Sequence, residues 1–245
     1  MDSKLETYKN WAGHHESNLG INCIEYSVRR FGVNKCTSAL TFRCSGNYWE
    51  NRYAGGENSG AGSYGRLAEF KAKFVNRFVK DHSIGSVIEF GVGDGHQLEL
   101  AEYPRYLGLD VSRTATQNCQ QRFASDNTKG FYLYDPAAFP DSHQLFRADL
   151  ALSLDVIYHL VEEHVFTAYM EHLFDAAEKF VIVYSSNRDA IPASPHVRHR
   201  NFSEWVSANR PQWKLKEKVP NRYPFDPKNA NETSFADFFV FELAT

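Results

Sequence analysis

The stretch "SVIEFGVGDGHQLEL", residues 86–100, passes from an apolar run through a cluster of glycines into an amphipathic segment. This pattern predicts a strand, then a tight turn that contains Gly91, Gly93 and Gly95, then a helix. Glycine adopts backbone angles that other residues avoid, and it lets the main chain come close to a ligand. Glu89 stands just before the turn, so the ligand expected there must suit a carboxylate.

Around this stretch, apolar runs of strand length alternate with segments of helical periodicity. Strands are expected at 86–90, 106–110, 131–135, 149–155 and 179–186. Such β–α alternation predicts a parallel, doubly wound sheet. The last two expected strands, 213–220 and 234–243, have no helix between them and should pair antiparallel. We therefore predict an α/β fold with a doubly wound, seven-stranded mixed sheet.

Composition limits the classes of function. The 245 residues carry a formal charge of −3, which is not the basic footprint of a nucleic-acid binder. No apolar run reaches the roughly 18 residues that span a membrane, and the polar N-terminus lacks the apolar core of a secretion signal. The four cysteines include no CxxC pair, so we expect no structural zinc and a reduced, cytoplasmic protein.

The spacing of the glycine turn narrows the choice of ligand. The dinucleotide fingerprint is GxGxxG, whereas here the third glycine arrives one residue early. No GK[ST] follows, which excludes a phosphate-binding P-loop. A carboxylate two positions before Gly91 would repel a phosphate but suit a cation. S-adenosylmethionine (SAM) offers a cation in its ammonium and sulfonium groups.

At these residues the chain resembles the class I SAM-dependent methyltransferases. "IEFGVGDGHQL" is similar to their first motif, and "YLGLD" to their second strand, which ends in an acid. The resemblance implies a Rossmann-like fold with SAM as cofactor, bound by Glu89, Gly91, Gly93, Gly95 and Asp110. Both oxygens of Asp110 would accept hydrogen bonds from the ribose hydroxyls. Asp135, after the third strand, could accept from the adenine amino group. The alternatives are a turn without a ligand, a helix cap at Asp110 and an Asp-Pro turn at Asp135.

The segment before the first strand is rich in glycine, aromatic residues and arginine. Similar segments close over SAM and acceptor in small-molecule methyltransferases, so the resemblance implies a pocket wall of Tyr48, Trp49, Arg52 and Tyr53, with Trp49 on the SAM side. The loop 59–65 and Arg66 would bind the methionine carboxylate. Alternatively, Trp49 and Tyr53 belong to the core. We expect 46–65 to be a loop, 1–65 to form an N-terminal helical segment with a glycine-rich lid, and 66–245 to be the catalytic domain.

"SLDVIYHLVEEH", residues 153–164, follows the fourth expected strand and could supply a base. A hydroxyl acceptor must lose its proton to a base within hydrogen-bond reach, or to a metal-bound group. Asp155 and His159 are four residues apart, so on a helical turn they would share a face and Asp155 could orient the imidazole. His159 is the candidate base, and the alternative is a histidine packed beneath the sheet edge.

A loop after the fifth expected strand, residues 185–202, gathers cationic side chains. Guanidinium groups bind phosphate or carboxylate in a bidentate way, so Arg198 and Arg200 are candidate contacts for an anionic acceptor. His196 and His199 on the same loop are alternative catalytic bases. The alternative for the whole cluster is a solvated surface loop.

Taken together, the 48–72, 153–164 and 196–206 segments resemble bacterial methyltransferases of surface-polysaccharide and sugar-nucleotide pathways. This resemblance implies an O-methyltransferase for a small anionic or sugar-like acceptor, with no nucleic-acid partner. One rival is a small-molecule N-methyltransferase, which needs no base, and another is a SAM- or nucleoside-binding module without catalysis. A metal-dependent mechanism would use Asp155, Asn187 and Asp189, which match that pattern only loosely, so no metal is expected.

Overall fold

The computed structural model describes residues 44–190 and 194–244. Its strands are β1 (Val87–Phe90), β2 (Tyr106–Asp110), β3 (Lys129–Leu133), β4 (Ala148–Leu154), β5 (Ala177–Ser185), β6 (Trp213–Val219) and β7 (Asp237–Leu243). Its α-helices are α1 (Ser45–Ala54), α2 (Gly65–Asp81), α3 (Arg113–Arg122), α4 (Glu163–Asp175) and α5 (Phe202–Asn209). Short 3₁₀ helices are η1 (Ala61–Ser63), η2 (Gln97–Leu100), η3 (Ile157–His159) and η4 (Pro227–Glu232).

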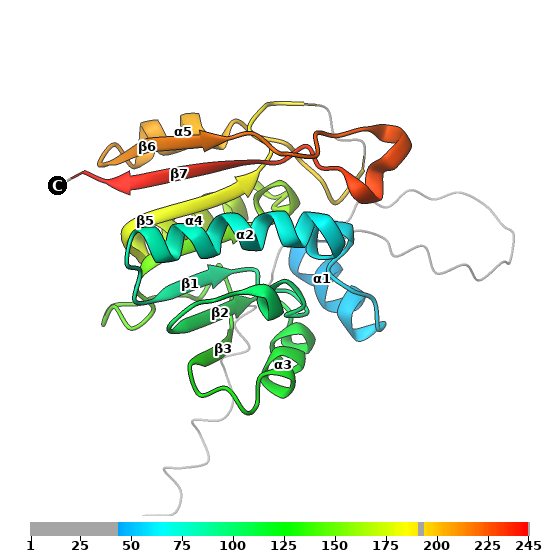
Figure 1. Cartoon of the computed structure of the whole chain (residues 1–245), viewed down its shortest axis with the longest axis horizontal. Helices are drawn as coiled ribbons and strands as arrows, with labels where there is room; N and C mark the ends of the chain where they lie inside the picture. The colour runs from blue at the N-terminus through cyan, green and yellow to red at the C-terminus, as the bar shows by residue number, and fades with distance from the viewer. Residues whose placement is uncertain (1–43, 191–193, 245) are drawn as a thin grey trace, which may run out of the picture. The chain divides into compact units, whose positions relative to one another are not determined.

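The strands form one sheet in the order β3-β2-β1-β4-β5-β7-β6 (Figure 1). β1 to β5 run parallel to one another, whereas β7 is antiparallel to both β5 and β6. The chain moves outward from β1 to β3 and then returns to the other side of β1, which makes β1 and β4 flank the switch point. The predicted doubly wound mixed sheet with an antiparallel last pair is confirmed.

Each face of the sheet packs on its own helices. β5 shows why: Val181 and Val183 point into the core shared with α4 and α5, while Phe180 and Ile182 point into the core shared with α2. This alternation follows from the two-residue period of a strand. Full burial of each such side chain stabilises the fold by about 1.5–3 kcal/mol. The helices therefore hold the strand ends in fixed positions.

The prediction of a loop over residues 46–65 is wrong for its first half, which forms α1. That helix has no side-chain cap of its own, and its ends and middle are instead held by contacts with distant loops. The helix expected after the glycine turn shortens to η2. The N-terminal helix expected before residue 44, with Cys23 and Cys36, lies outside the described residues. Among the described residues, no helix combines the length and apolar character needed to cross a bilayer.

Candidate functional site

The glycine turn after β1 requires glycine on steric grounds. Gly91, Gly93 and Gly95 have φ angles of 92°, 62° and 78°, in the left-handed region that favours this residue. A Cβ on Gly91 would lie 2.4 Å from Cγ2 of Val156, and one on Gly93 would lie 2.4 Å from Oγ of Ser59. The predicted tight turn is confirmed, and its main chain is close to two other loops.

Two buried carboxyl groups border this turn. Glu89, on β1, accepts a hydrogen bond of 2.6 Å from the hydroxyl of Tyr106, and burial raises its pKa to about 7. Asp110, at the end of β2, accepts from the backbone N–H of Gly93 and of Ser112, each at 2.8 Å. Burial also raises the pKa of Asp110, to about 6. Each oxygen of Asp110 uses one of its two lone pairs, so each can still accept from a ligand hydroxyl.

Residues 44–64, here called the strap, lie against this turn. Ser59 donates its backbone N–H to Asp94 Oδ2 at 2.8 Å and accepts from the backbone N–H of Asp94 at 3.0 Å. The hydroxyl of Tyr64 donates to the same carboxylate at 2.8 Å. Burial alone would raise the pKa of Asp94, but the hydrogen bonds from His96, Ser59 and Tyr64 lower it below its ordinary value.

The strap is anchored to two further loops. Glu50 accepts from both hydroxyls at the start of α3, from Ser112 at 2.6 Å and from Thr114 at 2.7 Å. Ser45 donates to Glu162 and to the backbone carbonyl of His159. The strap thus connects the loops that follow β1, β2 and β4, which is where ligands bind in open α/β sheets.

A buried ion pair lies between α2 and the end of β4. Lys71 Nζ is 2.6 Å from Asp155 Oδ2, and the Lys71 side chain is 1% exposed. The hydroxyl of Tyr158 donates to Asp155 Oδ1 at 2.8 Å. Sequence reasoning missed Lys71, although it stands four residues from Leu67 and from Val75 on the apolar stripe of α2. A lysine on such a stripe is the signal that could have found it.

A cavity of about 240 Å³ adjoins this ion pair. It is lined by Tyr48, Trp49, Arg52, Ser59, Gly60, Ala61, Gly62, Ser63, Asp155, Tyr158, His159, His196, Val197 and Phe235. Residues from the strap, from the loop after β4 and from the loop after β5 therefore meet here, as the sequence predicted for Tyr48, Trp49, Arg52, Asp155, His159 and His196.

His159 is held by a backbone group. Its Nδ1 lies 3.0 Å from the carbonyl oxygen of His196, and because that oxygen only accepts, Nδ1 carries the proton and Nε2 the lone pair. Burial lowers the pKa of His159 to about 4, so the imidazole is neutral at pH 7. The prediction that Asp155 orients this ring is wrong: its two oxygens bind Lys71 and Tyr158 instead.

Aromatic rings form one wall of the cavity. Tyr48 stacks on His196 with 4.6 Å between ring centroids, and Trp49 meets His159 edge-on at 4.9 Å. Tyr53 is buried behind Trp49 and bonds Ser59 through its hydroxyl. The core alternative therefore describes Tyr53, whereas Trp49 borders the cavity.

All four predicted ligand-binding arginines have partners within the protein, and Arg52 pairs with Glu57 at 3.2 Å and donates to the carbonyl of Asn58 at 2.7 Å. Arg66 donates to the carbonyl of Glu232 at 2.7 Å and lies over the ring of Tyr223. Arg200 is buried, donates to the carbonyls of Leu160 and Val161, and covers the ring of Phe166.

Arg198 donates to the carbonyl of Val161 and pairs with Glu163 at 3.0 Å. Arg66, Arg198 and Arg200 lie outside the lining of the cavity, and their roles as ligand contacts stay predictions. The pairing of Arg198 and Arg200 fixes the loop before α4.

Two further candidates lie outside the cavity lining. His199 bonds the hydroxyl of Ser186 through Nδ1 at 2.7 Å and meets Phe235 edge-on. Asp135 is exposed, and its Oδ1 accepts from the backbone N–H of Ala137 at 2.9 Å, which is the turn alternative. The turn uses Oδ1, so Oδ2 could still accept from the adenine amino group, and that role of Asp135 stays a prediction. Among the described residues, no cluster of three or more His, Cys, Asp or Glu could hold a metal.

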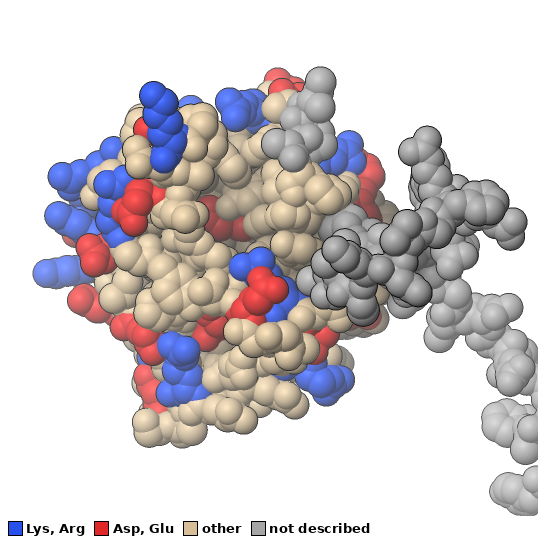
Figure 2. Space-filling model, turned by 90° about the vertical axis from the view of Figure 1, so that its right-hand side faces the viewer, with Lys and Arg blue, Asp and Glu red and all other residues tan. Residues whose placement is uncertain are grey.

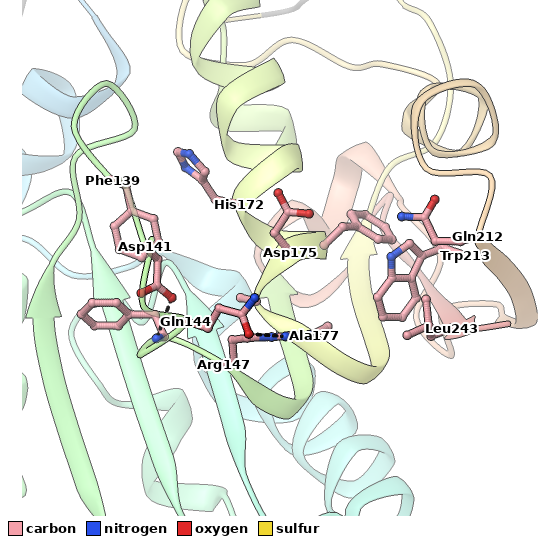
Figure 3. Close-up of a pocket in the computed structure, with 13 residues that line it drawn as sticks. Phe139, Asp141, Gln144, Arg147, His172, Asp175, Ala177, Gln212, Trp213 and Leu243 are labelled. Atoms are coloured by element: carbon pink, nitrogen blue, oxygen red, sulfur yellow. Dashed lines mark hydrogen bonds between the residues drawn. The ribbon is translucent and has the colours of Figure 1, made fainter. Parts of the chain in front are cut away.

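A larger hollow of about 470 Å³ lies at the opposite edge of the sheet, near the first residues of β4, β5 and β6 (Figure 3). Two pairs involve its lining: Gln144 accepts from Arg147, and Asp175 pairs with Arg210 outside the hollow. Size alone does not select a site. We assign the site to the smaller cavity, because it lies at the carboxyl ends of the parallel strands.

The surface seen in Figure 2 carries charges of both signs, with acidic and basic side chains interspersed among uncharged ones. No broad basic area crosses the described part of this view, which agrees with the formal charge of −3.

No family model matches the sequence, and no curated protein matches it. The structure is nevertheless similar to solved methyltransferases. Magnesium protoporphyrin IX methyltransferase from Synechocystis PCC 6803 with bound SAM aligns at a TM-score of 0.58 and 16% identity, covering 85% of this chain and 100% of that one. N-methyltransferase NodS from Bradyrhizobium japonicum WM9, in complex with S-adenosylhomocysteine (SAH), aligns at 0.56 and 16%, covering 73% and 88%. The methyltransferase domain of bacterial CtHen1 aligns at 0.55 and 19%, covering 71% and 97%. The fold is that of SAM-dependent methyltransferases.

Proposed function

We propose that this protein is a SAM-dependent methyltransferase that methylates an oxygen of a small acceptor in the cytoplasm, with His159 as general base. The observation that carries the proposal is the position of two buried carboxyl groups, Glu89 and Asp110, beside a glycine turn that adjoins a cavity containing a neutral imidazole. The two carboxyl groups, the glycine turn and the imidazole lie at the ends of adjacent strands, so one bound SAM molecule could reach all of them.

The residues at the turn fit SAM chemically. SAM supplies a methyl group on a cationic sulfur. A buried carboxyl with a raised pKa is ionised more readily beside a cation, which suits Glu89. Asp110 keeps one lone pair on each oxygen for the two ribose hydroxyls. Gly93 presents main chain without a side chain where the strap crosses the turn.

His159 fits the part of a base that removes a hydroxyl proton. Its Nε2 holds the lone pair, and its ring borders the same cavity as Asp155 and the strap. Alignment of the acceptor with the methyl donor can lower the activation barrier by on the order of 7 kcal/mol or more. Removal of the hydroxyl proton by His159 would lower the barrier further.

The acceptor predicted from the sequence was small and anionic or sugar-like, in a carbohydrate pathway. The arginines that motivated a phosphorylated group, Arg198 and Arg200, are paired with Glu163 and with backbone carbonyls. Arg52 also has partners, Glu57 and the carbonyl of Asn58, but its side chain lines the cavity, so the anionic part of the proposal rests on this residue.

Calorimetric titration with SAM and with SAH tests the donor site. We expect Asp110→Asn to weaken SAM binding at least tenfold, and the matched surface variant Asp175→Asn to leave it unchanged. Incubation with methyl-labelled SAM and candidate acceptors then tests transfer. Binding of neither SAM nor SAH at millimolar concentration would contradict the proposal, whereas binding without transfer to any acceptor would favour a module without catalysis.

A further inference from the structure

The cavity beside His159 is walled by flat rings. Its lining contains the rings of Tyr48, Trp49, Tyr158, His159, His196 and Phe235. Tyr48 and His196 stack nearly parallel, with 11° between their planes, and His159 is parallel to His196 within 14°. Aromatic partners prefer such faces and edges, because stacked and edge-to-face pairs add stabilisation beyond the area that they bury.

Several hydrogen-bonding side chains of this lining already have partners within the protein. The lining holds no Asn, Gln or Glu, and each oxygen of its one carboxylate, Asp155, already accepts from one partner, Lys71 or Tyr158. The hydroxyl of Ser59 is shared between Tyr53 and the backbone of Asp94. A sugar would bring several hydroxyl groups into this space, and each one left unpaired costs about 1–3 kcal/mol.

The polar functions that do remain suit one acidic oxygen. Nε2 of His159 carries a lone pair. Burial lowers the pKa of His196 and the positive charge of Arg52 lowers it further, and the guanidinium, which pairs with Glu57, lies 5.8 Å from the centroid of the Trp49 ring. A base and a cation at one edge, with rings on the other sides, favour a flat acceptor with its charge at one end.

The size of the cavity suits an acceptor with a single ring. A dry cavity of about 150 Å³ binds benzene. About 240 Å³ therefore accommodates one six-membered ring with small substituents.

From these observations we infer that the acceptor is a small single-ring aromatic compound with an acidic oxygen, either a phenol or an aromatic carboxylate. This inference rests on the proposed function. The acceptor oxygen forms its bond to the methyl carbon as the carbon–sulfur bond breaks, and the sulfonium becomes a neutral thioether. A phenol gives its proton to Nε2 of His159 and from there to water, whereas a carboxylate has no proton to give.

The test compares para-substituted phenols and benzoates with methyl glucoside and glucose 1-phosphate. Binding is measured by calorimetry in the presence of SAH, and transfer is measured with labelled SAM. We expect the aromatic panel to bind and to be methylated, and the sugars to do neither. Tyr48→Leu should weaken aromatic binding about tenfold, while the matched variant of an exposed ring, Tyr132→Leu, should not.

His159→Gln separates the two kinds of acidic oxygen. It should weaken the binding of both acceptors by the loss of one ring from the wall, and in addition it should lower kcat for phenols at least a hundredfold but not kcat for benzoates. Failure of the whole aromatic panel to bind would overturn the inference, as would methylation of the sugars alone. If SAM and SAH still bind in that case, the proposed function survives. If they do not bind, both fall.

Discussion

Replacement of Lys71 by methionine should destabilise the fold strongly, because it leaves a carboxylate without its cation. The Lys71 side chain is 1% exposed and that of Asp155 is 14% exposed, with 2.6 Å between Nζ and Oδ2. Methionine keeps the apolar stem and has nearly the helix propensity of lysine, so α2 itself should be unaffected. The substitution therefore tests the ion pair and not the helix.

The expected loss follows from the geometry. At an effective dielectric constant of about 20, two charges 2.6 Å apart attract each other by about 6 kcal/mol before desolvation is subtracted. Removing one partner of a buried pair costs about 3–5 kcal/mol. Asp155 keeps its bond from Tyr158 and some contact with water, which places our expectation for Lys71→Met at about 3 kcal/mol, the lower end.

A double-mutant cycle provides the assay. Urea unfolding of the wild type, Lys71→Met, Asp155→Asn and the double variant gives the coupling free energy. Asparagine suits position 155, where φ is 61°, because Asn and Asp adopt left-handed angles more readily than most residues. We expect the double variant to recover at least half of the loss. A single-variant loss below about 1 kcal/mol, or additive losses, would refute this reasoning.

Three other outcomes can be measured directly. Burial raises the pKa of Asp110 to about 6 and that of Glu89 to about 7. Because bound SAM should favour the ionised forms of both carboxyl groups, the affinity for SAM should rise between about pH 5 and about pH 8, and binding should release protons. Calorimetry in two buffers of different ionisation enthalpy measures this, and proton uptake would contradict it. Burial lowers the pKa of His159 to about 4 from an ordinary value of about 6.5, so between these two pH values the imidazole is protonated in the unfolded chain and neutral in the folded one. The free energy of unfolding should therefore rise with pH across this window, and it should rise less in His159→Gln. Urea unfolding at about pH 5 and about pH 7 would show the difference. Glu50→Ala removes the acceptor at the start of α3, so amide hydrogen exchange in the strap should accelerate, whereas unchanged protection would mean that Glu50 does not hold it.

Local patterns allowed the sheet and the glycine turn to be predicted from the sequence. Periodicity identified the strands, and the need for left-handed backbone identified the turn at Gly91, Gly93 and Gly95. Asp110 was also placed correctly at a strand end, because the end of an apolar run before a polar segment is visible in the sequence.

Side-chain partners could not be predicted, because they come from residues distant in the chain. Nothing near Arg200 in the sequence shows that its guanidinium binds the carbonyl of Val161, 39 residues away. In the same way α1 forms in a segment of weak helical character because Ser45 and Glu50 bind loops elsewhere in the domain. Isolated helices of such length are marginal, and tertiary contacts decide them.

The Asp110 carboxylate also accepts hydrogen bonds from the backbone of Gly93 and Ser112, so it stabilises the fold whether or not a nucleoside is bound. We therefore expect it to persist even in related proteins that no longer bind a nucleoside. An acidic residue at this position in a related sequence therefore does not by itself indicate methyltransferase activity. The aromatic residues that line the cavity beside His159 should indicate better which related proteins keep the activity and which acceptors they use.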